Sequence, residues 1–217
     1  MKNILFVLFI LIIFSCKNFN DEFSQEESKS LIYPGEKNFK FLRQVTFGGD
    51  NAEAYWSFDD QKLIFQSNNP KWNVRCDQMF VMNYNESFSN TKPQMVSAGK
   101  GRTTCAYFLP DNKHFLYAST HLQGENCPDT PLRVEENYVW PIYDSYDIFI
   151  SDLEGNITRQ LTNENGYDAE ATISPLGDKI VFTSMRSGDL ELYTMNLNGN
   201  DIKQITNQLG YDGGAFF

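Results

Sequence analysis

The 217-residue chain has few of the residues that catalytic and metal sites usually require. It contains two histidines, His114 and His121, and four cysteines. No Gly-x-Ser-x-Gly sequence occurs, so the nucleophile motif of α/β-hydrolases is missing. No Cys-x-x-Cys pair suggests a structural zinc site either. We therefore predict no catalytic residue, no metal and no cofactor for this chain.

The sequence also lacks clusters of basic residues. Eighteen Lys and Arg stand against 28 Asp and Glu, which gives a net charge of −10 at pH 7. Neutralisation of phosphate charges provides most of the affinity of proteins for nucleic acids. We therefore exclude nucleic acid as a partner. The same balance argues against docking on anionic lipid headgroups.

A long hydrophobic segment is the third absence. The apolar run at residues 4–14 is shorter than the roughly 20 residues that span a bilayer. With Lys2 before it, the run is typical of a secretory signal peptide. The sequence Ile-Phe-Ser-Cys that ends at Cys16 resembles a bacterial lipobox, which implies that Cys16 is lipidated. An ordinary signal peptide or an unprocessed anchor is the alternative.

We accordingly predict three regions. Residues 1–15 are the lipoprotein signal peptide, and residues 16–39 are an acidic, disordered tether. Residues 40–217 form the folded part. The expected location is the cell envelope, with a lipid anchor in the outer membrane on its periplasmic face or at the cell surface.

A segment that occurs almost twice gives the strongest indication of the fold. Arg-Gln-Leu-Thr-Asn-Glu-Asn-Gly-Tyr-Asp at 159–168 returns as Lys-Gln-Ile-Thr-Asn-Gln-Leu-Gly-Tyr-Asp at 203–212. A period of roughly 40–45 residues with strand-like content is typical of propeller blades. We therefore expect an all-β fold, a β-propeller of four-stranded blades.

Each repeat contains four segments in the same order. The first runs into a tight turn, the second and third are short and rich in β-branched and aromatic residues, and the fourth carries a glutamine. The first segments are 54–60, 106–112 and 171–177, the second 62–67, 114–119 and 179–184, the third 78–83, 147–152 and 191–196, and the fourth surround Gln44, Gln94, Gln160 and Gln204. An insertion at about 122–143 lengthens the middle repeat.

These motifs resemble a known family. Arg/Lys-Gln-Leu/Ile-Thr, Ser-Pro-x-Gly-x-Lys-Ile-Val-Phe and Glu-Leu-Tyr-Thr-Met-Asn-x-x-Gly look like the WD-type repeats of TolB-like β-propellers over roughly residues 40–217. The repeats fall at about 50–93, 99–162 and 166–206, with a partial one at 210–217. The resemblance implies six blades, so we expect a propeller truncated after three blades and part of a fourth. Completion by a partner or by oligomerisation is the alternative.

Three cysteines remain once Cys16 is lipidated. Cys76, Cys105 and Cys127 all map to the rim where the inner strands begin. An exported protein retains disulfides, and an odd number permits at most one bridge within the chain. We expect Cys105 to pair with Cys127 or with Cys76.

The same rim supplies candidate binding residues. Its acidic positions could hold a cation or a basic peptide, and the inserted loop offers aromatic side chains, which commonly anchor interfaces. The alternatives are that the acidic rim loops are simply solvated and that the aromatic side chains pack under the rim as a small separate cluster. The candidates are Glu53, Asp168, Glu170, Asp212, Tyr138, Trp140 and Tyr143.

Three functions fit these expectations. The first is a non-enzymatic, membrane-anchored envelope lipoprotein whose propeller binds a protein or peptide partner. The second is the N-terminal propeller of an exported prolyl-oligopeptidase-like hydrolase whose catalytic domain is absent from this chain. The third, a carbohydrate-active propeller with channel histidines, is disfavoured because neither histidine lies on an inner strand. We favour the first.

Overall fold

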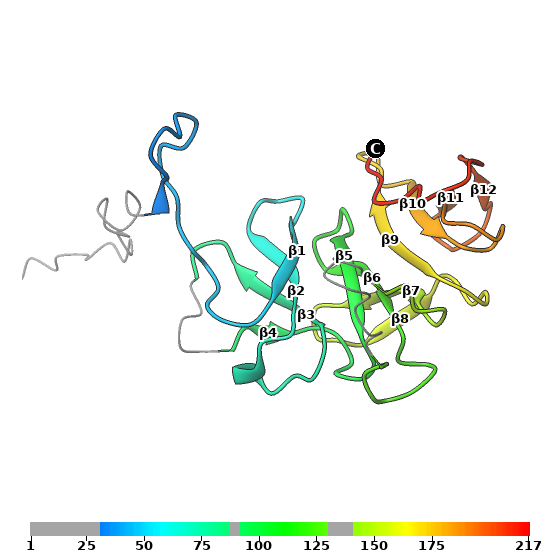
Figure 1. Ribbon diagram of the computed structural model, residues 1–217, viewed down its shortest axis with the longest axis horizontal. Helices are drawn as coiled ribbons and strands as arrows, with labels where there is room; N and C mark the ends of the chain where they lie inside the picture. Colours follow the sequence, from blue (N-terminus) through cyan, green and yellow to red (C-terminus); the bar gives the residue numbers. More distant parts are fainter. Residues whose placement is uncertain (1–30, 87–91, 130–140) are drawn as a thin grey trace, which may run out of the picture. The chain divides into compact units, whose positions relative to one another are not determined.

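The computed structural model describes residues 31–86, 92–129 and 141–217. The chain divides into two compact units, Met1–Gln44 and Val45–Phe217. All strands of the described residues belong to the second unit (Figure 1). The expected signal peptide, Cys16 and most of the tether lie outside the described residues.

Three antiparallel four-stranded sheets follow one another along the second unit, and each runs in simple sequence order (Figure 1). This arrangement confirms the all-β fold of four-stranded blades. The first sheet has β1 (Asn51–Trp56), β2 (Lys62–Ser67), β3 (Gln78–Asn83) and β4 (Gln94–Met95), the second β5 (Thr103–Phe108), β6 (His114–Ser119), β7 (Asp147–Asp152) and β8 (Ile157–Gln160), and the third β9 (Asp168–Ile173), β10 (Lys179–Ser184), β11 (Glu191–Asn196) and β12 (Lys203–Gln204). A 3-10 turn, η1 (Pro70–Trp72), follows β2.

The second and third strands of every blade lie where the sequence predicts them. The innermost strands begin three residues before the expected segments, and each contains a bulge. The segment around Gln44 and residues 210–217 are expected to contain strands, and the structure has none there.

The apolar cores lie between consecutive blades. Alternate residues of a strand face opposite sides of its sheet, so each blade can bury one face against the blade before it and the other against the blade after it. One core joins the first and second sheets: Ile64, Met79, Val81, Val96, Ala106, Phe108, Phe115, Tyr117 and Phe149. Another joins the second and third: Leu116, Ile148, Ile150, Leu161, Ala171, Ile173, Ile180, Phe182, Tyr193 and Met195. This packing holds β1, β5 and β9 next to one another.

Asp147, at the start of β7, makes the stability of the fold depend on pH. Burial raises its pKa to about 6, and Asp168 and Glu164 add to the shift, while a hydrogen bond from Thr162 opposes it. An unfolded Asp titrates near 4, so the folded state binds the proton more tightly. Stability is therefore lost as the pH rises from about 4 through about 6.

We expect Asp147→Asn to gain stability relative to the wild type across this pH window. The measurement is urea unfolding of both proteins at pH 4 and at pH 7. The unfolding free energy of the variant minus that of the wild type should be larger at pH 7 than at pH 4. Identical differences at the two pH values would contradict the raised pKa.

Candidate functional site

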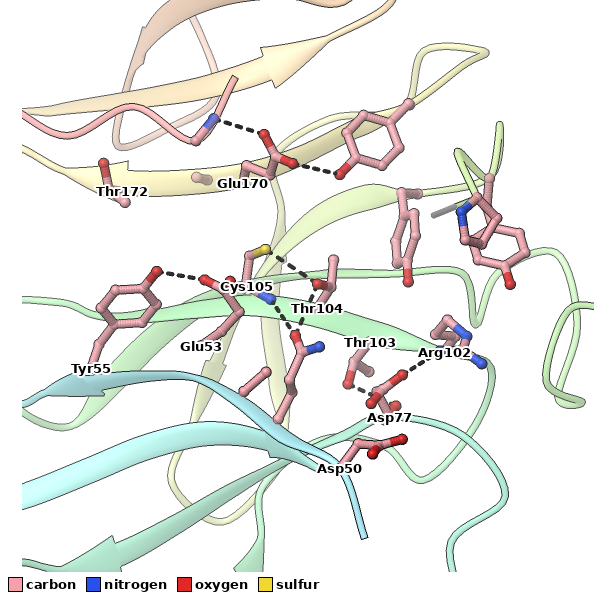
Figure 2. A pocket seen from close by; sticks show the side chains of 18 of the residues that line it. Asp50, Glu53, Tyr55, Asp77, Arg102, Thr103, Thr104, Cys105, Glu170 and Thr172 are labelled. Carbon is pink, nitrogen blue, oxygen red and sulfur yellow. Dashed lines mark hydrogen bonds and ion pairs between the residues drawn. The ribbon is translucent and has the colours of Figure 1, made fainter. Parts of the chain in front are cut away.

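The three innermost strands share an unusual backbone position. Glu53, Cys105 and Glu170 have φ values of 52°, 52° and 55°, and the strand register shifts at each of them. A side chain in this left-handed region costs roughly 1–3 kcal/mol, so surrounding contacts must hold it. Bulges of this kind re-aim side chains. Here they bring one residue from each blade to a common space (Figure 2).

Gly214 continues the series. It lies at the position of the next repeat that corresponds to Glu170, and its φ is 63°. The register of the repeat therefore extends into the C-terminal segment, although no strand forms there. We call Glu53, Cys105, Glu170 and Gly214 the bulge layer.

The bulge layer borders a cavity of about 850 Å³. Its walls include β1, β5 and β9 (Figure 2), the end of the insertion with Tyr146, and the C-terminal segment. Among the described lining residues, Arg102 is the one cationic side chain. The acidic residues that line it are Asp50, Glu53, Asp77 and Glu170, and the tyrosines are Tyr55, Tyr143, Tyr146, Tyr167 and Tyr211.

The Glu170 carboxylate has its hydrogen-bonding capacity filled from within the protein. Oε1 accepts from the Tyr167 hydroxyl at 3.2 Å. Oε2 accepts from Thr183 Oγ1 at 2.7 Å, from the Tyr211 hydroxyl at 2.7 Å and from the Gly214 backbone N–H at 2.8 Å. A carboxylate with four donors is a structural acceptor that holds the C-terminal segment against β9.

The Cys105 position is different because its side chain is neutral. Burial raises the pKa of the thiol to about 12, and the charges of Glu53 and Glu170 add to the shift. Its backbone N–H donates to Gln66 Oε1 at 3.2 Å, which links the second blade to the first. Cys105 is therefore a protonated, poorly nucleophilic thiol.

The cavity disfavours further negative charge. Burial is the main cause that raises the pKa values of Tyr55, Tyr146, Tyr167 and Tyr211, and nearby anions add to each shift. Desolvation alone raises the pKa of a phenol, so the negative potential of the space comes from the carboxylates that line it. Cationic ligands are the ones such a space attracts.

One ion pair closes the end of the cavity near the insertion. Arg102 donates to Asp77 through Nη1, and its guanidinium carbon lies 5.7 Å from the centre of the Tyr143 ring. Burial raises the pKa of Asp77, and the Arg102 charge opposes that shift. The pair thereby neutralises this end and leaves the negative potential toward β1.

Aromatic rings lie two residues beyond the bulge layer. The ring centre of Tyr55 is 5.3 Å from that of Tyr107 and 5.7 Å from that of Phe216. The ring centres of Tyr107 and Phe216 are 6.1 Å apart. Thr172 holds the fourth equivalent position, and its hydroxyl donates to the Ala215 carbonyl at 2.8 Å. We call Tyr55, Tyr107 and Phe216 the aromatic floor.

The structure does not bring all predicted rim residues together. Asp168 is 2% exposed, and Arg186 Nη2 donates to it at 3.0 Å, so its expected place on the open rim is wrong. Asp212 is half-buried and does not line the cavity. Tyr143 is half-buried against Tyr146, with ring centres 5.8 Å apart. Tyr138 and Trp140 lie outside the described residues.

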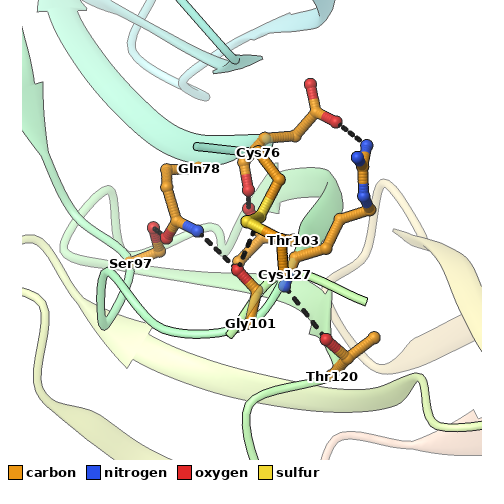
Figure 3. The surroundings of a disulfide bond; sticks show 9 residues. Cys76, Gln78, Ser97, Gly101, Thr103, Thr120 and Cys127 are labelled. Atoms are coloured by element: carbon orange, nitrogen blue, oxygen red, sulfur yellow. Dashed lines mark hydrogen bonds and ion pairs between the residues drawn. A yellow bond between two sulfur atoms is a disulfide. The ribbon is translucent and has the colours of Figure 1, made fainter. Parts of the chain in front are cut away.

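The expected pairing of Cys105 is also wrong. The disulfide joins Cys76 to Cys127 with a Cα–Cα separation of 5.9 Å (Figure 3), and Cys105 is a free thiol. Cys105 lies within β5, where the bulge aims it into the cavity, whereas Cys76 and Cys127 lie in loops. The bridge ties the start of the insertion to the first blade, next to Gly101.

The two histidines have local partners. His114 Nδ1 is 2.6 Å from Asp111 Oδ2, and His121 Nδ1 is 2.8 Å from Ser119 Oγ. Burial lowers the pKa of His121. In residues 31–86, 92–129 and 141–217, no group of three His, Cys, Asp or Glu side chains is placed to hold a metal ion. No helix within these ranges is both long and apolar enough to cross a membrane.

Comparison with solved structures identifies the fold as a propeller. TolB from Acinetobacter baumannii matches with a TM-score of 0.53 and 19% identity over 76% of this chain and 34% of that chain. A putative TolB from Agrobacterium tumefaciens matches with a TM-score of 0.37 and 19% identity, over 76% of this chain and 65% of that chain. A puromycin-hydrolyzing peptidase from Mycobacterium tuberculosis matches with a TM-score of 0.47 and 12% identity, over 74% of this chain and 24% of that chain.

The chain has the fold of TolB-like β-propellers, as its repeats predict. It spans about a third of the length of the Acinetobacter TolB chain. No protein-family model and no curated protein matches the sequence. At these identities the likeness concerns the fold alone.

Sequence reasoning missed the aromatic floor and the Arg102–Asp77 pair. The floor had a usable signal, because Tyr55, Tyr107 and Phe216 each follow a bulge residue by two positions. Arg102 and Asp77 are far apart in the repeat pattern, and only the packing of two blades brings them together.

Proposed function

We propose that this chain is an envelope lipoprotein whose TolB-like propeller binds a protein or peptide partner at the innermost strands. The observation that carries the proposal is the cavity of about 850 Å³ where β1, β5 and β9 converge. Ligand sites are typically concave, with volumes of about 300–1,000 Å³ and a few polar groups among aromatic ones. The bulge layer and the aromatic floor supply that combination.

The arrangement supports binding more than catalysis. Cys105 is a neutral thiol, Glu170 is occupied by four donors, and neither histidine lines the cavity. The groups that remain accessible to a partner include the carboxylates of Asp50 and Glu53, aromatic rings and hydroxyls. Such groups recognise a ligand without an activated nucleophile and its base.

Site-specific photo-cross-linking in the source cells tests this proposal. A benzophenone side chain replaces Phe216, which lines the cavity and is 56% exposed. The matched control carries it at Ile157 of β8, which is 39% exposed and outside the cavity. We expect a discrete cross-linked partner from position 216 alone. Equal products from both positions would refute a site at the innermost strands.

The hydrolase alternative makes a different prediction. It requires a serine nucleophile elsewhere in the native protein. A fluorophosphonate probe that labels the protein isolated from its source would favour this alternative over the binding scaffold.

Lipid anchoring belongs to the proposal and has its own test. We expect Cys16→Ala to move the protein from the membrane fraction to the soluble fraction, because acyl chains would no longer hold it. Fractionation without detergent measures this, with Cys105→Ala as the matched control that stays membrane-bound. Membrane association unchanged by Cys16→Ala would sink the lipoprotein proposal.

A further inference from the structure

Glu53 is the charged residue of the bulge layer that faces the cavity with capacity to spare. Its side chain is exposed, and Oε2 accepts from the Tyr55 hydroxyl at 2.5 Å. That bond uses Oε2, and Glu53 lines the cavity with Oε1 left to accept from a ligand. Glu170 has no such capacity, since four donors already occupy it.

An apolar surface adjoins this carboxylate. Tyr55 and Phe216 both line the cavity, with ring centres 5.7 Å apart, and Tyr107 packs behind them. A cation next to aromatic rings gains from their quadrupoles as well as from a carboxylate. A hydrocarbon chain gains from burial against the same rings.

The charges around Glu53 have one sign. Asp50 is exposed in the same cavity, where its backbone N–H donates to Asn68 Oδ1 at 3.0 Å. The cationic member of the described lining, Arg102, is paired with Asp77. No counter-ion from this wall therefore neutralises Glu53 and Asp50, and an arriving cation provides the missing charge.

We infer that the cavity recognises a primary ammonium group on a peptide, with a lysine side chain as the fitting ligand. The ammonium lies at Glu53 Oε1, and the methylene stem lies on Tyr55 and Phe216. This inference rests on the proposed function and specifies its ligand class.

Lysine fits this site better than arginine. A guanidinium gains most when it donates two parallel hydrogen bonds to both oxygens of a carboxylate. A guanidinium that used both oxygens of Glu53 would have to share Oε2 with the Tyr55 hydroxyl. An ammonium is a compact point charge and needs one oxygen. The geometry thus selects between the two basic side chains.

The test uses the full-length protein and three capped pentapeptides, Gly-Ala-X-Ala-Gly, in which X is lysine, acetyl-lysine or arginine. Isothermal titration at about 20 mM salt limits screening. We expect the lysine peptide to bind at least about tenfold more tightly than the acetyl-lysine peptide, the range expected for a charge-assisted hydrogen bond. The arginine peptide should bind more weakly than the lysine peptide.

Two variants locate the effect. Glu53→Gln keeps the shape of the side chain and should weaken the lysine peptide roughly tenfold. Asp60→Asn removes the same charge from the turn after β1, outside the cavity, and should change the affinity less than about twofold. Equal effects of the two variants would mean that general electrostatics, rather than Glu53, attracts the peptide.

The outcomes separate this inference from the proposed function. Equal affinity for lysine and acetyl-lysine overturns the ammonium site on the unmodified protein, even if Glu53→Gln does not fold. A specific cross-link from position 216 without lysine binding leaves the binding scaffold standing and removes the ligand class. If neither a specific cross-link from position 216 nor lysine binding is observed, both the binding scaffold and its ligand class are refuted.

Discussion

Replacing both Cys76 and Cys127 with serine is expected to lower the free energy of unfolding by about 4 kcal/mol. The disulfide closes a loop with a sequence separation of 51. A cross-link of that span removes this much chain entropy from the unfolded state in the loop-closure account. The effect is large compared with the roughly 5–15 kcal/mol that stabilises a typical domain.

Urea unfolding under non-reducing conditions measures the loss, and Cys105→Ser is the matched control. Cys105 forms no disulfide, so its substitution should cost far less than loss of the bridge. A double variant as stable as the wild type would contradict the Cys76–Cys127 bridge. A large loss from Cys105→Ser alone would favour the pairing that the sequence suggested.

Replacing Arg186 with methionine is expected to cost about 3–5 kcal/mol. Arg186 donates to the Asp168 carboxylate at 3.0 and 3.2 Å, and Asp168 is 2% exposed. Loss of the guanidinium leaves a buried carboxylate without its counter-ion, which is the costly way to break an ion pair. The substitution also removes stacking on Phe182 and Tyr193, both 5.2 Å from the guanidinium carbon.

The double variant Arg186→Met with Asp168→Asn separates these contributions. Neutralising Asp168 should recover part of the loss, because the uncompensated charge is gone. Arg159→Met is the matched control: Arg159 is exposed and donates to Asn198 at the surface, so its loss should cost within about 0.5 kcal/mol. Equal costs at both arginines would refute a buried Asp168–Arg186 pair.

The strand pattern was the part of the fold that the sequence predicted best. The strands β2, β3, β6, β7, β10 and β11 lie at the predicted residues. These strands are central in their blades and largely buried, so their residue types report their environment directly. The short outer strands and residues 210–217 have fewer partners, and local pattern alone does not fix them.

The chemistry of the site was harder to predict, because it depends on pairings between blades. The repeat correctly aligned Glu53, Cys105 and Glu170, and the bulges explain why this register faces the cavity. The repeat did not reveal that Arg186 covers Asp168. Nor did it show that Cys105 lines the cavity while the two loop cysteines pair, since side-chain direction at a bulge does not follow simple alternation.

Hydrogen exchange with and without the lysine pentapeptide tests the central claim most directly. The account predicts slower exchange in β1, β5 and the segment around Gly214, with no change in β8 or β12, because the ligand contacts the bulge layer and the aromatic floor. Protection confined to the outer strands at saturating peptide would contradict a binding site at the innermost strands of this propeller.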